Sequence, residues 1–161
     1  MSTAPGFLES LRATYPAMQP DERLTWRKWL EIHQSEYDRF DYNVYIGIEQ
    51  DIGPPAPDPI RKMGVLLRQK RLDAVGYVGA HPTIFEVKKR AGPQNIGQIL
   101  VYLHWFPVTF PAAPPAVARI VAGDVDPHLP AVLAKLQIGL DLVPGVDYSV
   151  LRLLGSNVPT P

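Results

Sequence analysis

Five polar residues of the types found in metal-dependent hydrolases follow one another in the middle of the chain. They are Asp73, Glu86, Lys88, Gln98 and Tyr102. Two carboxylates that lie close together can hold Mg²⁺ or Mn²⁺, because these hard cations prefer oxygen ligands. Such a cation activates water for attack on a phosphate group. The residue types therefore predict hydrolysis of a phosphodiester, provided that the fold brings them together.

The two acids and the lysine fall on segments that are expected to form a β-hairpin. Glu86 and Lys88 share one face of a predicted strand over residues 83–88, because side chains alternate between the faces of a strand. A turn expected at residues 79–82 would bring the preceding strand, with Asp73, alongside. Alone, Glu-x-Lys is typical of an ordinary amphipathic strand, and Asp73 of a turn. Only their combination predicts a site.

The next segment is expected to be a helix that presents two polar residues to the same region. It begins at Gly92-Pro93, where proline suits the first turn, and runs to about Phe106. Gln98 and Tyr102 are four residues apart and therefore share a helix face. The ordinary alternative is a solvated glutamine and a half-buried tyrosine. Their position directly after the Glu-x-Lys strand favours a place in the site.

Basic residues flank the predicted site. Arg71 precedes Asp73, and Lys89 and Arg90 follow Lys88. Cationic side chains beside a metal site can contact the phosphates of a nucleic acid, although clusters of this kind are more often solvated charge. We expect Arg71, Lys89 and Arg90 to contact the nucleic acid.

The remaining elements are predicted from periodicity and from proline and glycine. A helix is expected over residues 21–40, with the acids Asp21 and Glu22 in its first turn, where they interact favourably with the helix dipole. Strands are expected over residues 44–48, within 64–78 and over 116–121. The final elements are a helix over 129–136, which Gly139 would end, and an edge strand over 148–153. Proline-rich loops are expected at 53–59, 107–115 and 157–161.

Composition limits the class of protein. The 161 residues are 46% apolar, which predicts a single domain over residues 1–161. Sixteen basic and sixteen acidic side chains cancel, so nucleic-acid contacts must be local. The chain has no cysteine, which excludes disulfides and thiolate metal sites. We expect a soluble protein without a membrane span or secretion signal, either cytoplasmic or associated with a virion.

These segments resemble the PD-(D/E)XK nuclease superfamily in its RecB-like branch. The resemblance rests on the segments Leu72-Asp73-Ala74-Val75, Ile84-Phe85-Glu86-Val87-Lys88-Lys89 and Gln98-Ile99-Leu100-Val101-Tyr102. It implies an α/β fold (α+β, with a mixed sheet) and an α-β-β-β-α-β core over about residues 20–122. The sequence departs from the family in having Leu72 where many members have proline.

The resemblance also implies a role for each residue. Asp73, Glu86 and the backbone carbonyl of Val87 would bind Mg²⁺ or Mn²⁺, and Lys88 would position the attacking water. Gln98 and Tyr102 would support substrate binding and site geometry. Some members add an acid or a histidine from the first helix, for which Glu36 and His33 are the candidates here. The implied activity is cleavage of DNA.

A second class of function remains open. The neutral net charge and the proline-rich loops also suit a structural or assembly protein that keeps a nuclease fold within a larger particle, such as a phage virion neck. Its partners would be copies of itself or other proteins of the assembly. A restriction-like endonuclease ranks third, because 161 residues leave little room for an element that recognises a DNA sequence.

Overall fold

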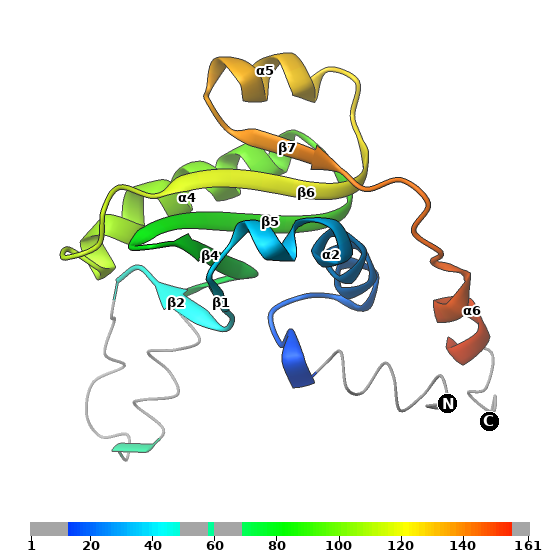
Figure 1. Cartoon of the computed structure of the whole chain (residues 1–161), viewed down its shortest axis with the longest axis horizontal. Coiled ribbons are helices and arrows are strands. Elements are labelled where there is room, and N and C mark those ends of the chain that lie inside the picture. Colours follow the sequence, from blue (N-terminus) through cyan, green and yellow to red (C-terminus); the bar gives the residue numbers. More distant parts are fainter. Residues whose placement is uncertain (1–12, 49–57, 60–68, 156–161) are drawn as a thin grey trace.

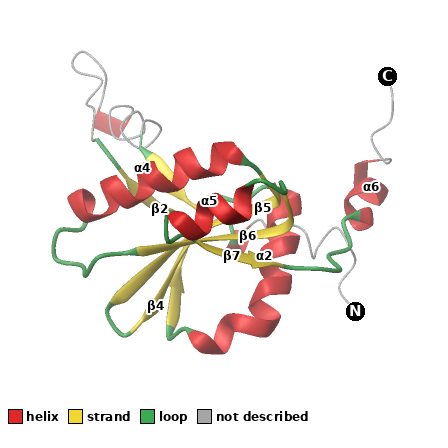
Figure 2. Cartoon of the chain, turned by 90° about the horizontal axis from the view of Figure 1, so that it is seen from above, coloured by secondary structure: helices red, strands yellow, loops and turns green. Residues whose placement is uncertain are grey.

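The fold is a mixed sheet with helices on both faces (Figure 1, Figure 2). The computed structural model describes residues 13–48, 58–59 and 69–155. The sheet has the strand order β1-β4-β5-β6-β7, with β1 Arg39–Asp41, β4 Ala74–Val78, β5 His81–Ala91, β6 Val117–Val125 and β7 Gly139–Leu142. A separate two-stranded sheet pairs β2 Val44–Ile46 with β3 Lys70–Leu72. The helices are α2 Pro20–His33, α4 Pro93–Thr109, α5 Leu129–Lys135 and α6 Ser149–Gly155. The predicted α/β class with a mixed sheet is confirmed.

Strand directions follow from the connections. β4 pairs antiparallel with β1 and with β5, whereas β5–β6 and β6–β7 are parallel pairs. Parallel neighbours need a crossover, and α4 and α5 supply these two crossovers. Between α2 and α4 the chain forms five strands in two sheets rather than the three strands predicted, because β2 pairs with β3 outside the main sheet and β1 begins within residues predicted as helix.

An aromatic core joins α2 to one face of the sheet. Trp26 and Trp29 stack with their ring centroids 4.7 Å apart, and both contact Phe85 of β5. Pro20 at the first helical turn and acids in that turn start α2. Burial of two tryptophans on β5 fixes this helix firmly, since large aromatic side chains contribute most to core packing. The N-terminus of α2 is thereby held beside the end of β5.

The opposite face of the sheet packs against α4 and α5. Ile84 of β5 and Ile120 of β6 are buried with Ile99 and Phe106 of α4 and with Leu133 of α5. Because side chains alternate along a strand, Glu86 lies on the same face as Ile84. The face of β5 that carries Glu86 is therefore the face covered by α4.

The hairpin predicted between the second and third strands is present. Val78 pairs with His81, and Gly79 in the turn has a φ of +57°, a left-handed conformation that favours glycine. At the other end of this hairpin the last pair is Ala74 with Phe85. Asp73 therefore lies just beyond the paired residues.

The first helix is shorter than predicted. α2 ends at His33, a 3₁₀ turn η1 follows at Gln34–Glu36, and β1 begins at Arg39. Tyr37 and Phe40 continue the helical spacing of the tryptophans, but they reach Phe85 from extended chain instead. Aromatic residues also favour strands, so their spacing did not distinguish the two structures.

Three further boundaries differ from the prediction. α4 extends past Pro107, which was expected in a loop, to Thr109, whose hydroxyl donates to the Trp105 carbonyl. Gly139 does not end α5; it begins β7, which was not predicted. The expected edge strand at 148–153 is instead helix α6, whose first amide, that of Ser149, donates to the Asp147 carboxylate. This cap favours a helix over a strand.

Several expectations fall outside the described residues, namely most of the loop at 53–59, the loop at 157–161 and residues 64–68 of the second strand. That strand is otherwise divided into β3 and β4 at Asp73. Across the part of the chain that the structure describes, no helix is long and apolar enough to cross a membrane.

Candidate active site

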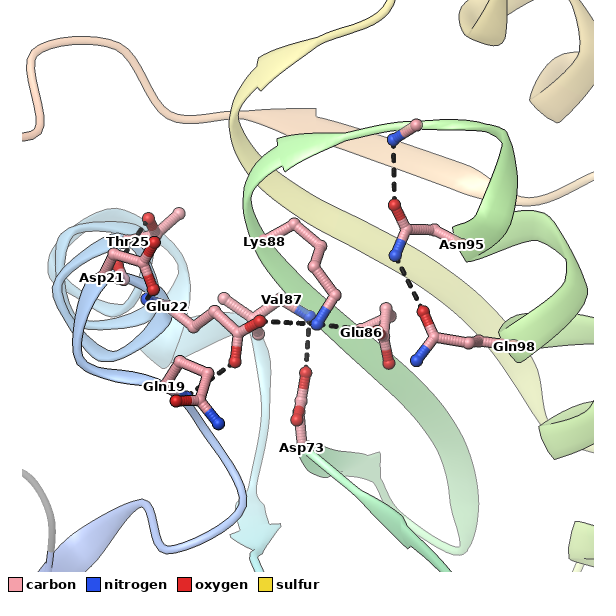
Figure 3. Close-up of polar contacts among 11 residues, drawn as sticks. Gln19, Asp21, Glu22, Thr25, Asp73, Glu86, Val87, Lys88, Asn95 and Gln98 are labelled. Carbon is pink, nitrogen blue, oxygen red and sulfur yellow. Dashed lines mark hydrogen bonds and ion pairs between the residues drawn. The ribbon is translucent and has the colours of Figure 1, made fainter.

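The site lies at an edge of β5 that β4 leaves open. Beyond the pair Ala74–Phe85, the amide of Val87 would lack a strand partner, and Asp73 Oδ2 accepts its hydrogen bond at 2.8 Å. The N–H and C=O of one residue in an extended strand point to the same side. The Val87 carbonyl, predicted as a metal ligand, therefore lies on the same edge as the Asp73 carboxylate (Figure 3).

Glu86 is almost fully buried beneath α4, with 1% of its surface exposed. Its Oε1 atom lies 3.0 Å from Lys88 Nζ, close enough for an ion pair, although the geometry is not that of a hydrogen bond. Tyr102 lies near the same carboxyl group and lowers its pKa. Glu86 thus keeps a buried acceptor oxygen without a well-formed hydrogen bond.

Lys88 lies between two carboxylates. Its ammonium nitrogen donates to Glu22 Oε1 at 2.6 Å on one side and faces Glu86 on the other (Figure 3). The second carboxylate oxygen of Glu22 accepts the Gln19 amide at 2.7 Å, which caps α2. Glu22 therefore links the start of the first helix to the site.

Sequence reasoning gave Glu22 only a helix-dipole role. The signal that could have found it is its place in the first turn of a helix that must pack on the Glu-x-Lys strand. An acid there reaches the strand end when Trp26 and Trp29, one and two turns later, are buried on that strand.

Burial raises the proton affinity of both site acids, and the charge of Glu86 raises that of Asp73 further. Asp73 is 7% exposed, and its pKa is raised well above the ordinary aspartate value, first by burial and then by the charge of Glu86. Burial also raises the pKa of Glu86, against the opposing effect of Lys88. Burial alone would lower the pKa of Lys88, but Glu86 and Asp73 outweigh it and raise that pKa. The lysine therefore stays charged.

The polar face of α4 reaches the site, as predicted. It includes one residue that the sequence did not predict, Asn95. Asn95 is fully buried; its Oδ1 accepts the Gly92 amide and its Nδ2 donates to Gln98 Oε1, both at 2.9 Å. The Gln98 oxygen is thereby engaged, so its amide nitrogen remains as the donor and lies on the side of Glu86 (Figure 3). Tyr102 is also buried, and burial followed by the Glu86 charge raises its pKa.

Replacement of Asn95 by alanine is expected to destabilise the fold by roughly 1–3 kcal/mol, because the Gly92 amide at the start of α4 loses its acceptor. Urea denaturation followed by tryptophan fluorescence measures the change. Gln94→Ala, an exposed change in the same helical turn, is the control and should differ from the native protein by less than about 0.5 kcal/mol. Equal effects of the two substitutions would contradict a structural role for the Asn95 hydrogen bonds.

The first-helix candidates are not brought to the site. His33 Nδ1 and Glu36 Oε1 lie 2.8 Å apart and pair with each other at the end of α2 and in η1. Glu36 acts electrostatically on Tyr37, which follows η1, and on Arg119 near the start of β6. Glu22, rather than Glu36, is the first-helix acid beside Lys88.

The predicted basic patch divides into three separate contacts. Arg71 donates to the Pro16 carbonyl at 2.9 Å. Arg90 forms an ion pair with Asp124 across β5 and β6. Lys89 places its ammonium group 4.9 Å from the centroid of the Tyr148 ring.

The donor set fits a magnesium-type cation. In the described ranges 13–48, 58–59 and 69–155, no group of three or more His, Asp or Glu side chains could hold a metal ion. Mg²⁺ needs only one or two carboxylates, with water and substrate phosphate completing its shell. Asp73, the Val87 carbonyl and the Glu86 oxygen that lacks a well-formed hydrogen bond provide such a set.

Comparisons of the chain with protein-family models, with curated proteins and with solved structures gave no match. The function is therefore inferred from the geometry of the site and the chemistry of its residues.

Proposed function

We propose that the protein is a metal-dependent nuclease that hydrolyses DNA phosphodiester bonds. The observation that carries this proposal is the arrangement on the open edge of β5. There the Asp73 carboxylate caps the Val87 amide beside the buried Glu86–Lys88 pair. An ordinary amphipathic strand would not bury two acids, since buried carboxylates are costly unless they are paired or bind a cation. The arrangement supports a functional reason for their burial.

In this mechanism Asp73, Glu86 and the Val87 carbonyl would hold Mg²⁺ or Mn²⁺. The bound cation would lower the pKa of water and offset the charge that builds on the phosphate. Lys88 would orient the attacking water through its ammonium group, which Glu22 and Glu86 hold in place. The free amide nitrogen of Gln98 would donate to a phosphate oxygen.

Cleavage of linear duplex and single-stranded DNA with Mg²⁺ or Mn²⁺ tests the proposal. The native protein should cut only when a metal is present, and Glu86→Gln should lower the rate by about a hundredfold, because one charge at the metal is lost. Glu31→Gln, which removes an exposed acid of α2, is the control and should cut at the native rate. Metal-independent cutting, or equal rates in the two variants, would contradict the assignment.

One observation favours the assembly role as the second candidate. Lys88 already pairs with both Glu22 and Glu86, so its single positive charge offsets part of the negative charge of the site without a metal. The net charge of zero also gives no general attraction to DNA. Failure of the folded native protein to cut DNA with either metal would favour this role.

A further inference from the structure

A hollow lies beside the candidate active site and has no role in the proposed cleavage reaction. It has a volume of about 810 Å³ and lies between the start of α2, β5 and α6. Its lining includes Pro20, Asp21, Lys89, Tyr148, Leu151 and Arg152. Gln19 also lines the hollow, and its amide donates to Glu22 Oε2, while the other carboxylate oxygen of Glu22 accepts from Lys88. The hollow therefore adjoins the Lys88–Glu22 pair on the side of Gln19, which is labelled in Figure 3.

The wall formed by Tyr148 is fixed by specific contacts. Its hydroxyl group forms a 2.7 Å hydrogen bond with the Thr25 hydroxyl of α2. The same hydroxyl lies against Gly123 of β6, where a Cβ atom would collide with it. The Lys89 ammonium group lies 4.9 Å from the centroid of its ring. These contacts tie the segment before α6 to α2, β5 and β6 and give the hollow a defined shape.

The charge and polarity of the lining suit a nucleic-acid strand. Lys89 and Arg152 contribute two positive charges against one acid, Asp21, whose Oδ1 accepts the Glu22 amide at the positive end of α2. Pro20, Leu151 and the Tyr148 ring supply apolar surface. Cations that neutralise phosphates beside apolar and aromatic surface are the combination by which proteins hold single strands.

We infer that this hollow binds the phosphodiester backbone of the DNA strand next to the bond that is cut, with Lys89 and Arg152 contacting its phosphates. The inference rests on the proposed function. It changes the set of nucleic-acid residues that the sequence predicted. Arg71 and Arg90 are engaged by Pro16 and Asp124, whereas Arg152 comes from a segment that was expected to be a strand.

Fluorescence anisotropy of a labelled DNA single strand, in EDTA so that no metal-dependent cleavage occurs, tests the hollow. Lys89→Gln and Arg152→Gln should each weaken binding roughly threefold and reduce the slope of log K against log salt by about 0.7, the effect of losing one phosphate contact. Lys135→Gln removes an exposed cation from the last turn of α5 and should change neither quantity. Native binding unchanged by Lys89→Gln and Arg152→Gln, or no native binding, would overturn the inference.

Binding and cleavage separate the two proposals. If the native protein cuts DNA while both variants bind DNA normally, the inference that the hollow binds DNA is wrong and the nuclease proposal stands. If both variants weaken binding but the native protein never cuts, binding of DNA in the hollow stands, whereas the nuclease proposal and the place of the hollow next to a cut bond are wrong. RNA of the same sequence provides the second arm: equal binding supports contact with the shared phosphodiester backbone, and tighter binding of RNA overturns the choice of DNA.

Discussion

Replacing Lys88 by methionine is expected to lower the free energy of unfolding by roughly 2–4 kcal/mol at neutral pH. Glu22 and Glu86 are 7% and 1% exposed, and the Lys88 ammonium group is 2.6 Å and 3.0 Å from their oxygens. Methionine keeps most of the side-chain volume but leaves two buried carboxylates without a cation. The large effect comes from those uncompensated charges rather than from lost packing.

Urea denaturation followed by the fluorescence of the buried tryptophans measures this loss. The loss should shrink as the pH falls, because protonation of the carboxylates removes the charge that Lys88 offsets. Lys28→Met is the matched control: Lys28 pairs with Glu31 at 3.1 Å, but these side chains are 45% and 53% exposed, so less than about 0.5 kcal/mol is expected. Similar losses in both variants would contradict the buried bridge.

The same substitution is expected to reduce metal-dependent cleavage by roughly 10²- to 10⁴-fold, because it removes the ammonium group proposed to orient the water. The assay belongs at a temperature where the variant remains folded. Adding Glu22→Gln to Lys88→Met should recover stability by removing one unpaired charge, yet should not recover cleavage. Recovery of both would mean that Lys88 acts only through folding.

The centre of the site was predictable because its signals are local. The hairpin turn, the alternation along residues 83–88 and the four-residue step from Gln98 to Tyr102 each depend on neighbours in the chain. They placed Asp73, Glu86 and Lys88 correctly beside one another. Local periodicity therefore sufficed wherever a single hairpin and the next helix made the contacts.

Glu22 and Asn95 were missed for a different reason. Glu22 is separated from Lys88 by 66 positions, and its local pattern is that of any acid in a first helical turn. Asn95 follows proline in a first turn, where exposed polar residues are common, yet it is fully buried. Only the packing of α2 and α4 on opposite faces of the sheet gives these side chains partners, and no local pattern specifies that packing.

The C-terminal region shows how a short pattern misleads. Residues 148–153 were expected to form an edge strand, but the Asp147 carboxylate accepts the Ser149 amide and a helix follows. Gly139 fits a helix end equally well, whereas the residue with a left-handed φ of +57° is Gln137. Strand β7 then forms because β6 offers it a parallel edge. Tertiary pairing decided both elements.

The open edge of β5 connects this fold to its chemistry. β4 stops pairing at Ala74, whereas β5 continues to Ala91 and pairs with β6 along its whole second half. The unpaired side of β5 must satisfy its backbone amides in another way, and Asp73 does so for Val87. A carboxylate bound to a backbone amide is held rigidly, which keeps it beside Glu86 despite their repulsion. The sheet thereby holds two like charges at the place where the proposed cation would bind.

Replacing Asp73 by asparagine is expected to separate stability from activity. The asparagine carbonyl oxygen can still accept the Val87 amide, but the charge that repels Glu86 disappears. Cleavage should fall roughly 10²- to 10³-fold because a charge at the proposed metal site is lost. Without metal, the variant should be more stable than the native protein at neutral pH, an effect opposite to that of Lys88→Met.

The pH dependence fixes the sign of this effect. Burial and Glu86 raise the pKa of Asp73 in the folded protein, so the folded state binds its proton more tightly than the unfolded state does. The Asp73 contribution to stability is therefore fully present below the ordinary aspartate pKa and declines as the pH rises toward the folded value. Asparagine has no proton to lose, so its advantage should grow over that range and vanish in acid.

Thermal unfolding of both proteins from acid to neutral pH, with and without Mg²⁺, measures these effects. Mg²⁺ should raise the Tm of the native protein and leave that of Asp73→Asn almost unchanged, because ligands stabilise only the state that binds them. Asp38→Asn is the matched control, because Asp38 accepts the Gly79 amide at 2.6 Å but is exposed. This variant should be slightly less stable than the native protein, and Mg²⁺ should raise its Tm by no more than it raises the native Tm. If Asp73→Asn is instead less stable than the native protein at neutral pH, the Asp73 charge serves the fold, and the case for a cation between Asp73 and Glu86 is lost.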